Sequence, residues 1–308
     1  MGTIVMTGGT SGFGQVAARE LTRSGRDRLV LGSRSGAATT ADVEVLPLDL
    51  AVLDSVRTFA DDVRARADRI DALVLNAGVY RPDVDGRTVD GFETTFAVNH
   101  LGNYLLLRLL VDRLAEGARV VLTTSGTHDP AERSGFPPPR HADARLLAHP
   151  ERDSDIDRRP RRAGRRAYTS SKLCAVLTAQ ALAVHPHAVA RRVTAIAYCP
   201  GQAPGTGLTR DEAFPVRAMW WLMGTAALRA PARRLVPQFS SRDEAGRLLA
   251  DLAVGAVRPP AGHVHVALRH GRATFPAPSE LATRSDVAAR LWEDSAGLVG
   301  VRAAAGSA

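Results

Sequence analysis

The chain has 308 residues, 45% of them hydrophobic, which is enough to bury the core of one large domain. The formal net charge is +8, but aromatic residues make up only 5% of the chain and, apart from residues 158–166, the arginines are scattered. This composition argues against a nucleic-acid-binding protein that stacks bases on aromatic side chains. We expect the arginine-rich residues 158–166 to form a solvated loop.

The cysteines and the apolar stretches indicate the compartment. Cys174 and Cys199 lie in apolar surroundings, and the N-terminal residues do not resemble a signal peptide. The apolar run at residues 218–228 is too short to span a bilayer. We therefore expect a cytoplasmic protein without membrane insertion. No metal-ligand cluster is visible, and His100 and His128 are expected to be packing or surface histidines.

A glycine-rich turn separates the first predicted strand, residues 2–7, from a predicted helix at residues 15–24. Glycine permits positive φ and close approach of a ligand, and the helix that follows directs its free N–H groups toward a pyrophosphate. A strand, a turn and a helix in this order are typical of a dinucleotide site. The residues predicted to bind the cofactor here are Gly8, Thr10, Ser11, Gly12, Phe13 and Gly14.

The second predicted strand, residues 28–34, ends in Ser33 and Arg34. An Asp or Glu at this distance from the glycines would bind the ribose hydroxyls of NAD, whereas arginine suits the 2′-phosphate of NADP. The sequence therefore favours NADPH/NADP over NAD, although a surface arginine is common in so arginine-rich a chain.

Strands and helices continue to alternate through the next part of the chain. A third strand, residues 43–50, contains Asp49 and Leu50 near its end, and a fourth, residues 70–75, is followed by Asn76, Ala77 and Gly78. Small residues at the carboxyl end of a strand fit the crevice where an open α/β sheet binds its ligand. Helices are predicted at residues 53–67 and 91–115, and a fifth strand at residues 119–125.

Residues 126–164 lack an apolar period and are interpreted as an excursion. A helix at residues 167–184 and a strand at 192–198 follow, and residues 202–240 resemble a substrate lid that carries Trp220 and Trp221. The last predicted elements are a helix at 241–254, a strand at 263–268 and a helix at 280–298. The alternation predicts an α/β fold: one domain, residues 1–308, with a Rossmann-type doubly wound parallel sheet and helices on both faces.

Tyr168 and Lys172 stand four residues apart, so they share one face of the predicted helix. Lys172 is the only lysine in the chain, which suggests that this position requires a compact ammonium rather than a guanidinium. A nearby positive charge favours the phenolate form of tyrosine. We therefore expect Lys172 to lower the pKa of Tyr168 toward a value that is useful near neutral pH.

Motif residues recur at fixed places through the chain: Thr7, Gly8, Gly12, Gly14, Asp49, Leu50, Asn76, Ala77, Gly78, Asn99, Ser125, Tyr168, Lys172, Pro200 and Gly201. In this order they resemble the pattern of the short-chain dehydrogenase/reductase family over nearly the whole chain. Within that family the chain is most similar to the branch of light-dependent protochlorophyllide reductases and retinol dehydrogenases. The likeness to this branch rests in part on Asp90-Gly91-Phe92-Glu93 and on the long excursion before Tyr168. One departure is Gln202, because protochlorophyllide reductases have a cysteine after the Pro-Gly pair.

The resemblance implies the roles of the candidate catalytic residues. Tyr168 would be the general acid or base and Lys172 would also bond the nicotinamide ribose. Ser125 would bond the substrate oxygen, and Asn99 would hold a helix kink and a water molecule. Tyr168, Lys172, Pro200, Gly201 and Thr206 would contact the cofactor, and Gln202, Trp220 and Trp221 the substrate.

The expected function is NADPH-dependent hydride transfer to a carbonyl of a bulky, apolar small molecule, a ketoreductase reaction. One alternative is reduction of a carbon–carbon double bond, and another is an NADP-binding sensor that has lost turnover. The scarcity of lysine is typical of a GC-rich genome and favours a bacterial enzyme of secondary metabolism. The resemblance allows homo-oligomers as well as monomers.

Overall fold

The computed structural model describes residues 2–23, 25, 27–35, 43–203 and 238–301. Within these ranges the strands form one sheet in the order β3-β2-β1-β4-β5-β6-β7-β8. The first seven strands are parallel to their neighbours, and β8 pairs antiparallel with β7. The strands are β1 (Gly2–Thr7), β2 (Asp27–Ser33), β3 (Val43–Pro47), β4 (Ile70–Leu75), β5 (Leu114–Thr123), β6 (Thr194–Cys199), β7 (His265–Arg269) and β8 (Arg272–Thr274).

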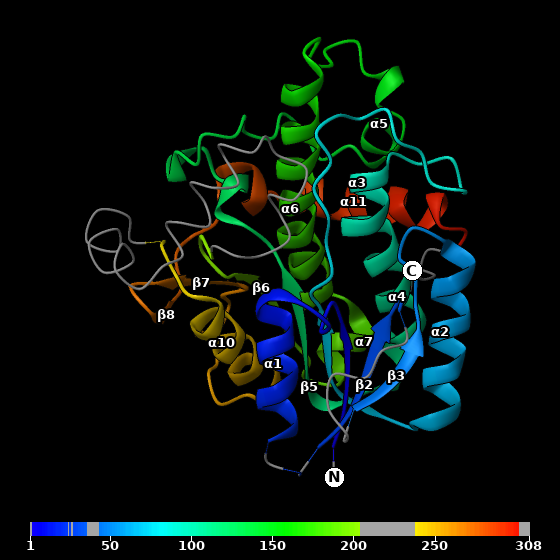
Figure 1. The fold of residues 1–308 in the computed structure, drawn as a ribbon, viewed down its shortest axis with the longest axis vertical. Helices are drawn as coiled ribbons and strands as arrows, with labels where there is room; N and C mark the ends of the chain where they lie inside the picture. Colours follow the sequence, from blue (N-terminus) through cyan, green and yellow to red (C-terminus); the bar gives the residue numbers. More distant parts are fainter. Residues whose placement is uncertain (1, 24, 26, 36–42, 204–237, 302–308) are drawn as a thin grey trace.

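Helices cover both faces of this sheet (Figure 1). On β1, Ile4 and Met6 pack into the apolar cluster under the helices of one face, and Val5 between them packs into the cluster of the other face. Because both faces are covered, the middle of a central strand is apolar on both sides, as in Ile4-Val5-Met6 of β1 and Ala72-Leu73-Val74 of β4. α1 (Gly12–Thr22) and α10 (Arg242–Val254) lie on one face, and α2 (Leu53–Arg66), α4 (Asn103–Leu110), α6 (Pro160–Ala183) and α7 (Pro186–Ala190) on the other.

The strand order reverses between β1 and β4, with β2 and β3 on one side and β5 to β8 on the other. In an open α/β sheet such a reversal opens a crevice at the carboxyl ends of the strands, where ligands bind. The predicted doubly wound α/β fold is confirmed. The predicted site residues that the structure describes and that do not lie on helices are found at or just after the carboxyl ends of the strands.

The single helix predicted at residues 91–115 is broken in the structure. It consists of α3 (Thr94–Phe96), a π-helical turn η1 (Ala97–Gly102), α4 and a 3-10 turn η2 (Val111–Arg113). The side-chain amide of Asn103 donates to the carbonyls of Val98 (3.1 Å) and Asn99 (3.3 Å), which stabilises the wider turn. π-helical turns are rare and occur mostly at functional sites.

The arginine-rich residues 158–166 are not the solvated loop that the composition suggested. α6 begins at Pro160, seven residues earlier than predicted, and proline is well suited to a first helical position. Asp157 accepts hydrogen bonds from Arg162 (2.8 Å) and Arg166 (2.5 Å) on successive turns. The predicted excursion therefore ends inside α6, after the short helical segments η3 (Gly126–His128), η4 (Pro130–Glu132), α5 (Ala144–Ala148) and η5 (Pro150–Arg152).

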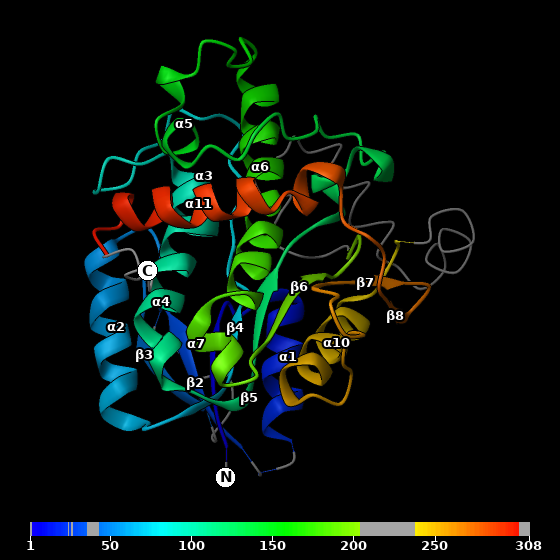
Figure 2. The same ribbon diagram turned by 180° about the vertical axis from the view of Figure 1, so that it is seen from behind.

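The C-terminal helix also differs from its prediction. It begins as a 3-10 turn, η7 (Glu280–Thr283), and continues as α11 (Ser285–Leu298), which crosses α6 on the outer side of the molecule (Figure 2). β8 and α7 were not predicted, because each is only three to five residues long. None of the described helices is both long and apolar enough to cross a membrane.

Candidate active site

The turn between β1 and α1 has the backbone that a phosphate-binding loop needs. Gly8 and Gly12 adopt φ values of +70° and +58°, in the region that side chains other than glycine rarely enter. Ser11 precedes α1 in extended conformation without capping it, and the first turn of α1 carries no acidic residue. The N–H groups at the start of α1 are therefore suited to an anion such as a pyrophosphate.

Gly14 is the tightest position in this turn. A Cβ there would lie 2.0 Å from the carbonyl oxygen of Gly8. We expect Gly14→Ala to displace the turn and to weaken dinucleotide binding by about a hundredfold or more, measured by fluorescence titration with NADPH. The matched control is Gly297→Ala in α11, where a Cβ meets nothing within 4 Å and binding should be unchanged. Equal affinities of the Gly14 variant and the wild type would refute the assignment of the turn.

Asn76 joins the glycine turn to the middle of the sheet. Its Nδ2 donates to the carbonyl of Gly8 (2.9 Å), and its Oδ1 accepts from the hydroxyl of Thr123 at the end of β5 (2.9 Å). The hydroxyl of Thr7 accepts from the backbone N–H groups of Asn76 and Ala77, both at 3.1 Å. The ends of β1, β4 and β5 are thus locked together, so Thr7 and Thr123 support the site that sequence reasoning had built on Asn76.

Asn99 lies in the π-helical turn η1, which interrupts the helix predicted there. Its Oδ1 accepts from the N–H of Val79 (2.7 Å), while its Nδ2 donates to the carbonyl of Val79 and to the hydroxyl of Ser171, both at 2.9 Å. A Cβ at Gly78 would lie 3.1 Å from Asn99 Oδ1 and 3.3 Å from Lys172 Nζ. Gly78 therefore allows the amide and the ammonium to lie close to the same backbone segment.

The structure brings Tyr168, Lys172 and Ser125 together. Tyr168 and Lys172 are buried on α6, with the Lys172 Nζ 5.6 Å from the centre of the Tyr168 ring. Ser125, which follows β5, lies beside the Tyr168 side chain. The Lys172 Nζ donates to the carbonyl of Thr123 (3.1 Å). Two hydroxyl groups and an ammonium thus gather at the carboxyl ends of the central strands.

The direction of the Tyr168 pKa shift differs from the prediction. Burial raises the pKa of Tyr168 above its ordinary value, and the hydrogen bond with Ser125 only partly opposes this. Burial also lowers the pKa of Lys172 to about 8, so that the ammonium loses its proton more readily than an exposed lysine. The expected lowering of the Tyr168 pKa by Lys172 is therefore wrong for the protein by itself.

Thr124 is a further residue that sequence reasoning missed. Its N–H donates to the carbonyl of Tyr198 on β6 (2.8 Å), and its hydroxyl donates to the carbonyl of Lys172 (2.6 Å). It therefore fixes α6 against the end of β5, one residue before Ser125. A threonine at the end of a strand is too common in sequences to be recognised as a support of the site.

The residues predicted to bind the adenosine part of the cofactor lie at the ends of β2 and β3. Ser33 is buried, with its hydroxyl 3.2 Å from that of Ser35, and Arg34 is exposed. Asp49 accepts from the N–H of Ala51 (2.9 Å), which shapes the turn in which Leu50 is buried. Arg34 is therefore accessible to a ligand at the edge of the crevice.

Pro200 and Gly201 follow β6 directly, and Gly201 has a φ of +73°. The carbonyl of Pro200 accepts from the hydroxyl of Ser240 (2.7 Å). The backbone of Gln202 pairs with that of residues 238–240, so the two ends of the predicted lid lie side by side. Thr206, Trp220, Trp221 and the rest of the lid up to residue 237 lie outside the described residues.

Two aromatic rings surround Tyr168. Tyr80 lies edge-on to Tyr168 at 5.9 Å between ring centres, and Phe136 at 6.0 Å. Such edge-on pairs add roughly 0.5–1.5 kcal/mol beyond the burial of area. Phe136 comes from the excursion, which therefore contributes a wall next to the candidate catalytic hydroxyl.

Comparisons with known proteins agree with this arrangement. A family model described as short chain dehydrogenase matches residues 2–133. Protochlorophyllide reductase A of Oryza sativa subsp. japonica is 34% identical over 97% of this chain and 81% of its own length. Protochlorophyllide reductase of Avena sativa is 32% identical over 97% of this chain and 99% of its own.

A solved structure supports the same assignment. The crystal structure of an uncharacterised protein from Mycobacterium paratuberculosis superposes with a TM-score of 0.68 at 27% identity, over 98% of this chain and 94% of that one. With the family model, the relatives and the arrangement of Tyr168, Lys172, Ser125 and Asn99 in agreement, the chain belongs to the short-chain dehydrogenase/reductase family of oxidoreductases and is similar to its protochlorophyllide reductase branch.

Proposed function

We propose that the protein is an NADPH-dependent reductase that acts on a carbonyl of a bulky, apolar small molecule. The observation that carries this proposal is the position of Ser125 beside the buried Tyr168 side chain, where it partly opposes the rise of the Tyr168 pKa, so that two hydroxyl groups would face a substrate together. Two adjacent hydroxyl donors suit one acceptor, a carbonyl oxygen that becomes negative as it is reduced.

The choice of NADPH rests on the residues that would hold it. The turn of Gly8, Gly12 and Gly14 and the free start of α1 would take the pyrophosphate, and exposed Arg34 would take the 2′-phosphate. Lys172 and Tyr168 would face the nicotinamide ribose. When bound, the cofactor supplies the hydride, and the protein supplies position and proton.

In this proposal Tyr168 delivers the proton. Burial keeps its hydroxyl protonated, so it can donate to the carbonyl oxygen while Ser125 holds that oxygen by a second hydrogen bond. The product is an alcohol, and a tyrosinate remains beside Lys172. The ammonium of Lys172 then stabilises that anion until a proton returns from solvent.

The cofactor choice is tested by Arg34→Ala. Loss of a charge-assisted bond to a phosphate should raise the dissociation constant for NADPH by roughly tenfold to a hundredfold and leave that for NADH nearly unchanged. Isothermal titration of both nucleotides measures the effect. Arg290→Ala, which removes an exposed arginine from α11, should change neither constant. Equal weakening of NADPH and NADH by Arg34→Ala would remove the 2′-phosphate assignment.

Reduction of a carbon–carbon double bond is the second candidate, because relatives at 34% and 32% identity are named protochlorophyllide reductases. The two reactions are separated by product analysis with an α,β-unsaturated ketone and NADPH. A ketoreductase yields the unsaturated alcohol. A saturated ketone as the product would mean that the protein reduces the alkene and not the carbonyl.

A further inference from the structure

His128 lies directly behind Ser125 and has no place in the reaction proposed above. Its ring is buried, with 1% of the residue exposed, in the short turn η3 that follows β5. Its Nδ1 lies 2.6 Å from the carbonyl oxygen of Ser125, and its backbone N–H donates to the same oxygen at 3.2 Å. A carbonyl oxygen can only accept, so Nδ1 must carry the proton.

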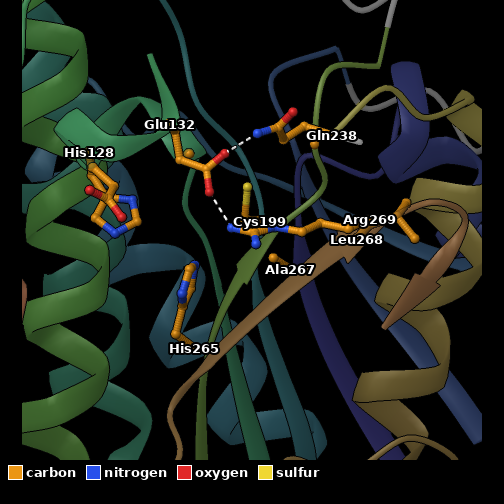
Figure 3. A pocket seen from close by; sticks show the side chains of 11 residues that line it. His128, Glu132, Cys199, Gln238, His265, Ala267, Leu268 and Arg269 are labelled. Atoms are coloured by element: carbon orange, nitrogen blue, oxygen red, sulfur yellow. Dashed lines mark hydrogen bonds and ion pairs between the residues drawn. The ribbon is translucent and has the colours of Figure 1, made fainter. Parts of the chain in front are cut away.

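A second buried histidine supports this ring. His265 on β7 is 5% exposed and meets His128 edge-on, with 5.2 Å between ring centres (Figure 3). Its own Nδ1 lies 3.3 Å from the carbonyl of Pro276. Burial lowers the pKa of both histidines, that of His265 to about 4, so both rings are neutral at neutral pH.

An ion pair fixes the other end of the segment that contains His128, residues 126–132. Glu132, in η4, forms an ion pair with Arg269 of β7 and accepts a hydrogen bond from Gln238 (Figure 3). Residues 126–132 are thus tied to β7 at two points, by His128 against His265 and by Glu132 with Arg269. Only the His128 contact reaches the backbone of Ser125 itself.

We propose that His128 is a positioning residue, which holds the Ser125 carbonyl and thereby aims the Ser125 hydroxyl at Tyr168. The backbone of Ser125 is extended, and its side chain also accepts from the N–H of Thr127 at 3.3 Å. With its carbonyl held by two donors from His128, the peptide plane after Ser125 cannot rotate freely. A displacement of a reacting group by about 1 Å can reduce turnover about a hundredfold. This inference rests on the proposed role of Ser125.

The test is a double-mutant cycle in the full-length protein, with NADPH oxidation on the best ketone or enone substrate as readout. His128→Leu should lower kcat by roughly tenfold to a hundredfold, with KM for NADPH within about twofold of wild type. His128→Asn, whose amide N–H can reach the place of Nδ1, should restore kcat to within about threefold of wild type. In the Ser125→Ala background, His128→Leu should lower kcat by less than about threefold, because its effect acts through Ser125.

The matched control is His263→Leu. His263 is exposed and makes the same kind of contact, from Nδ1 to the carbonyl of Ala261 at 3.3 Å, so its loss should not change kcat. Full additivity of His128→Leu with Ser125→Ala, or equal losses in His128→Leu and His128→Asn, would overturn the inference. If Ser125→Ala alone leaves kcat unchanged, the proposed function of Ser125 fails instead. Thermal unfolding shows whether each variant has folded. If His128→Leu has not folded, the kcat of His128→Asn is the measurement that tests the inference.

Discussion

Replacing Tyr168 by phenylalanine is expected to lower turnover by about a thousandfold, within the range typical of general acid–base catalysis, while NADPH still binds. The substitution removes only the hydroxyl that lies beside Ser125. The ring, with its edge-on contacts to Tyr80 and Phe136, stays in place. Because burial keeps the wild-type hydroxyl neutral, the variant removes no charge from the core, and the fold should be retained.

Single-turnover oxidation of NADPH at saturating substrate measures this effect without a contribution from product release. Tyr198→Phe is the matched control, since it also removes a buried tyrosine hydroxyl, one that donates to the carbonyl of Ala245 at 2.9 Å. It should cost about 1 kcal/mol of stability and leave turnover intact. Wild-type turnover in Tyr168→Phe, together with NADPH binding, would indicate a cofactor-binding sensor rather than an enzyme of this mechanism.

The strands and the order of the fold could be predicted because the signals are local. β1 and β4 are apolar runs that end in small or polar residues, and their observed bounds are those expected from the sequence. The failures arose where a specific side-chain hydrogen bond decides the local structure. Asn103 stabilises a π-helical turn, and Asp157 binds arginines on successive turns of α6. Neither contact is visible in a pattern of apolar residues.

The candidate site, too, could be predicted only in part. Asn99, Ser125, Tyr168 and Lys172 were predicted as a set, and the structure brings them together at one edge of the sheet. Most of their supports were not predicted: Asn103, Thr123, Thr124 and Ser171 act through hydrogen bonds to backbone or to other side chains. Thr7 entered only as part of the family pattern, and its bond to Asn103 spans 96 residues of sequence. A single sequence offers no signal that separates such residues from ordinary buried threonines and serines.

Lys172 is expected to titrate near pH 8 and to lower the stability of the protein below that pH. Its side chain is buried and donates to the carbonyl of Thr123, and burial lowers its pKa from the ordinary 10.5 to about 8. Because it is the only lysine, labelling with ¹⁵N-lysine gives one Nζ resonance, whose titration reports this pKa directly. A midpoint above pH 10 would contradict the burial of the ammonium.

The sign of the effect on stability follows from proton binding. Between pH 8 and 10.5 the unfolded chain binds a proton at Lys172 that the folded chain has released, so stability rises with pH in this window. Below pH 8 the cost of burying the ammonium is fully present, about 3 kcal/mol. Lys172→Met should therefore be more stable than wild type by about 3 kcal/mol at pH 7, and this difference should disappear by about pH 10.5.

Urea unfolding of both proteins across this pH range provides the measurement. Burial also raises the pKa of Tyr198, whose titration affects stability in the opposite direction, but both proteins share this group and the difference cancels it. The same variant should lose about a hundredfold in turnover, since no cation remains to stabilise the tyrosinate. A variant that is both more stable and nearly inactive would mean that Lys172 is retained for catalysis at the expense of the fold, as strained or buried polar groups at active sites often are. A destabilised Lys172→Met would instead assign the ammonium a structural role.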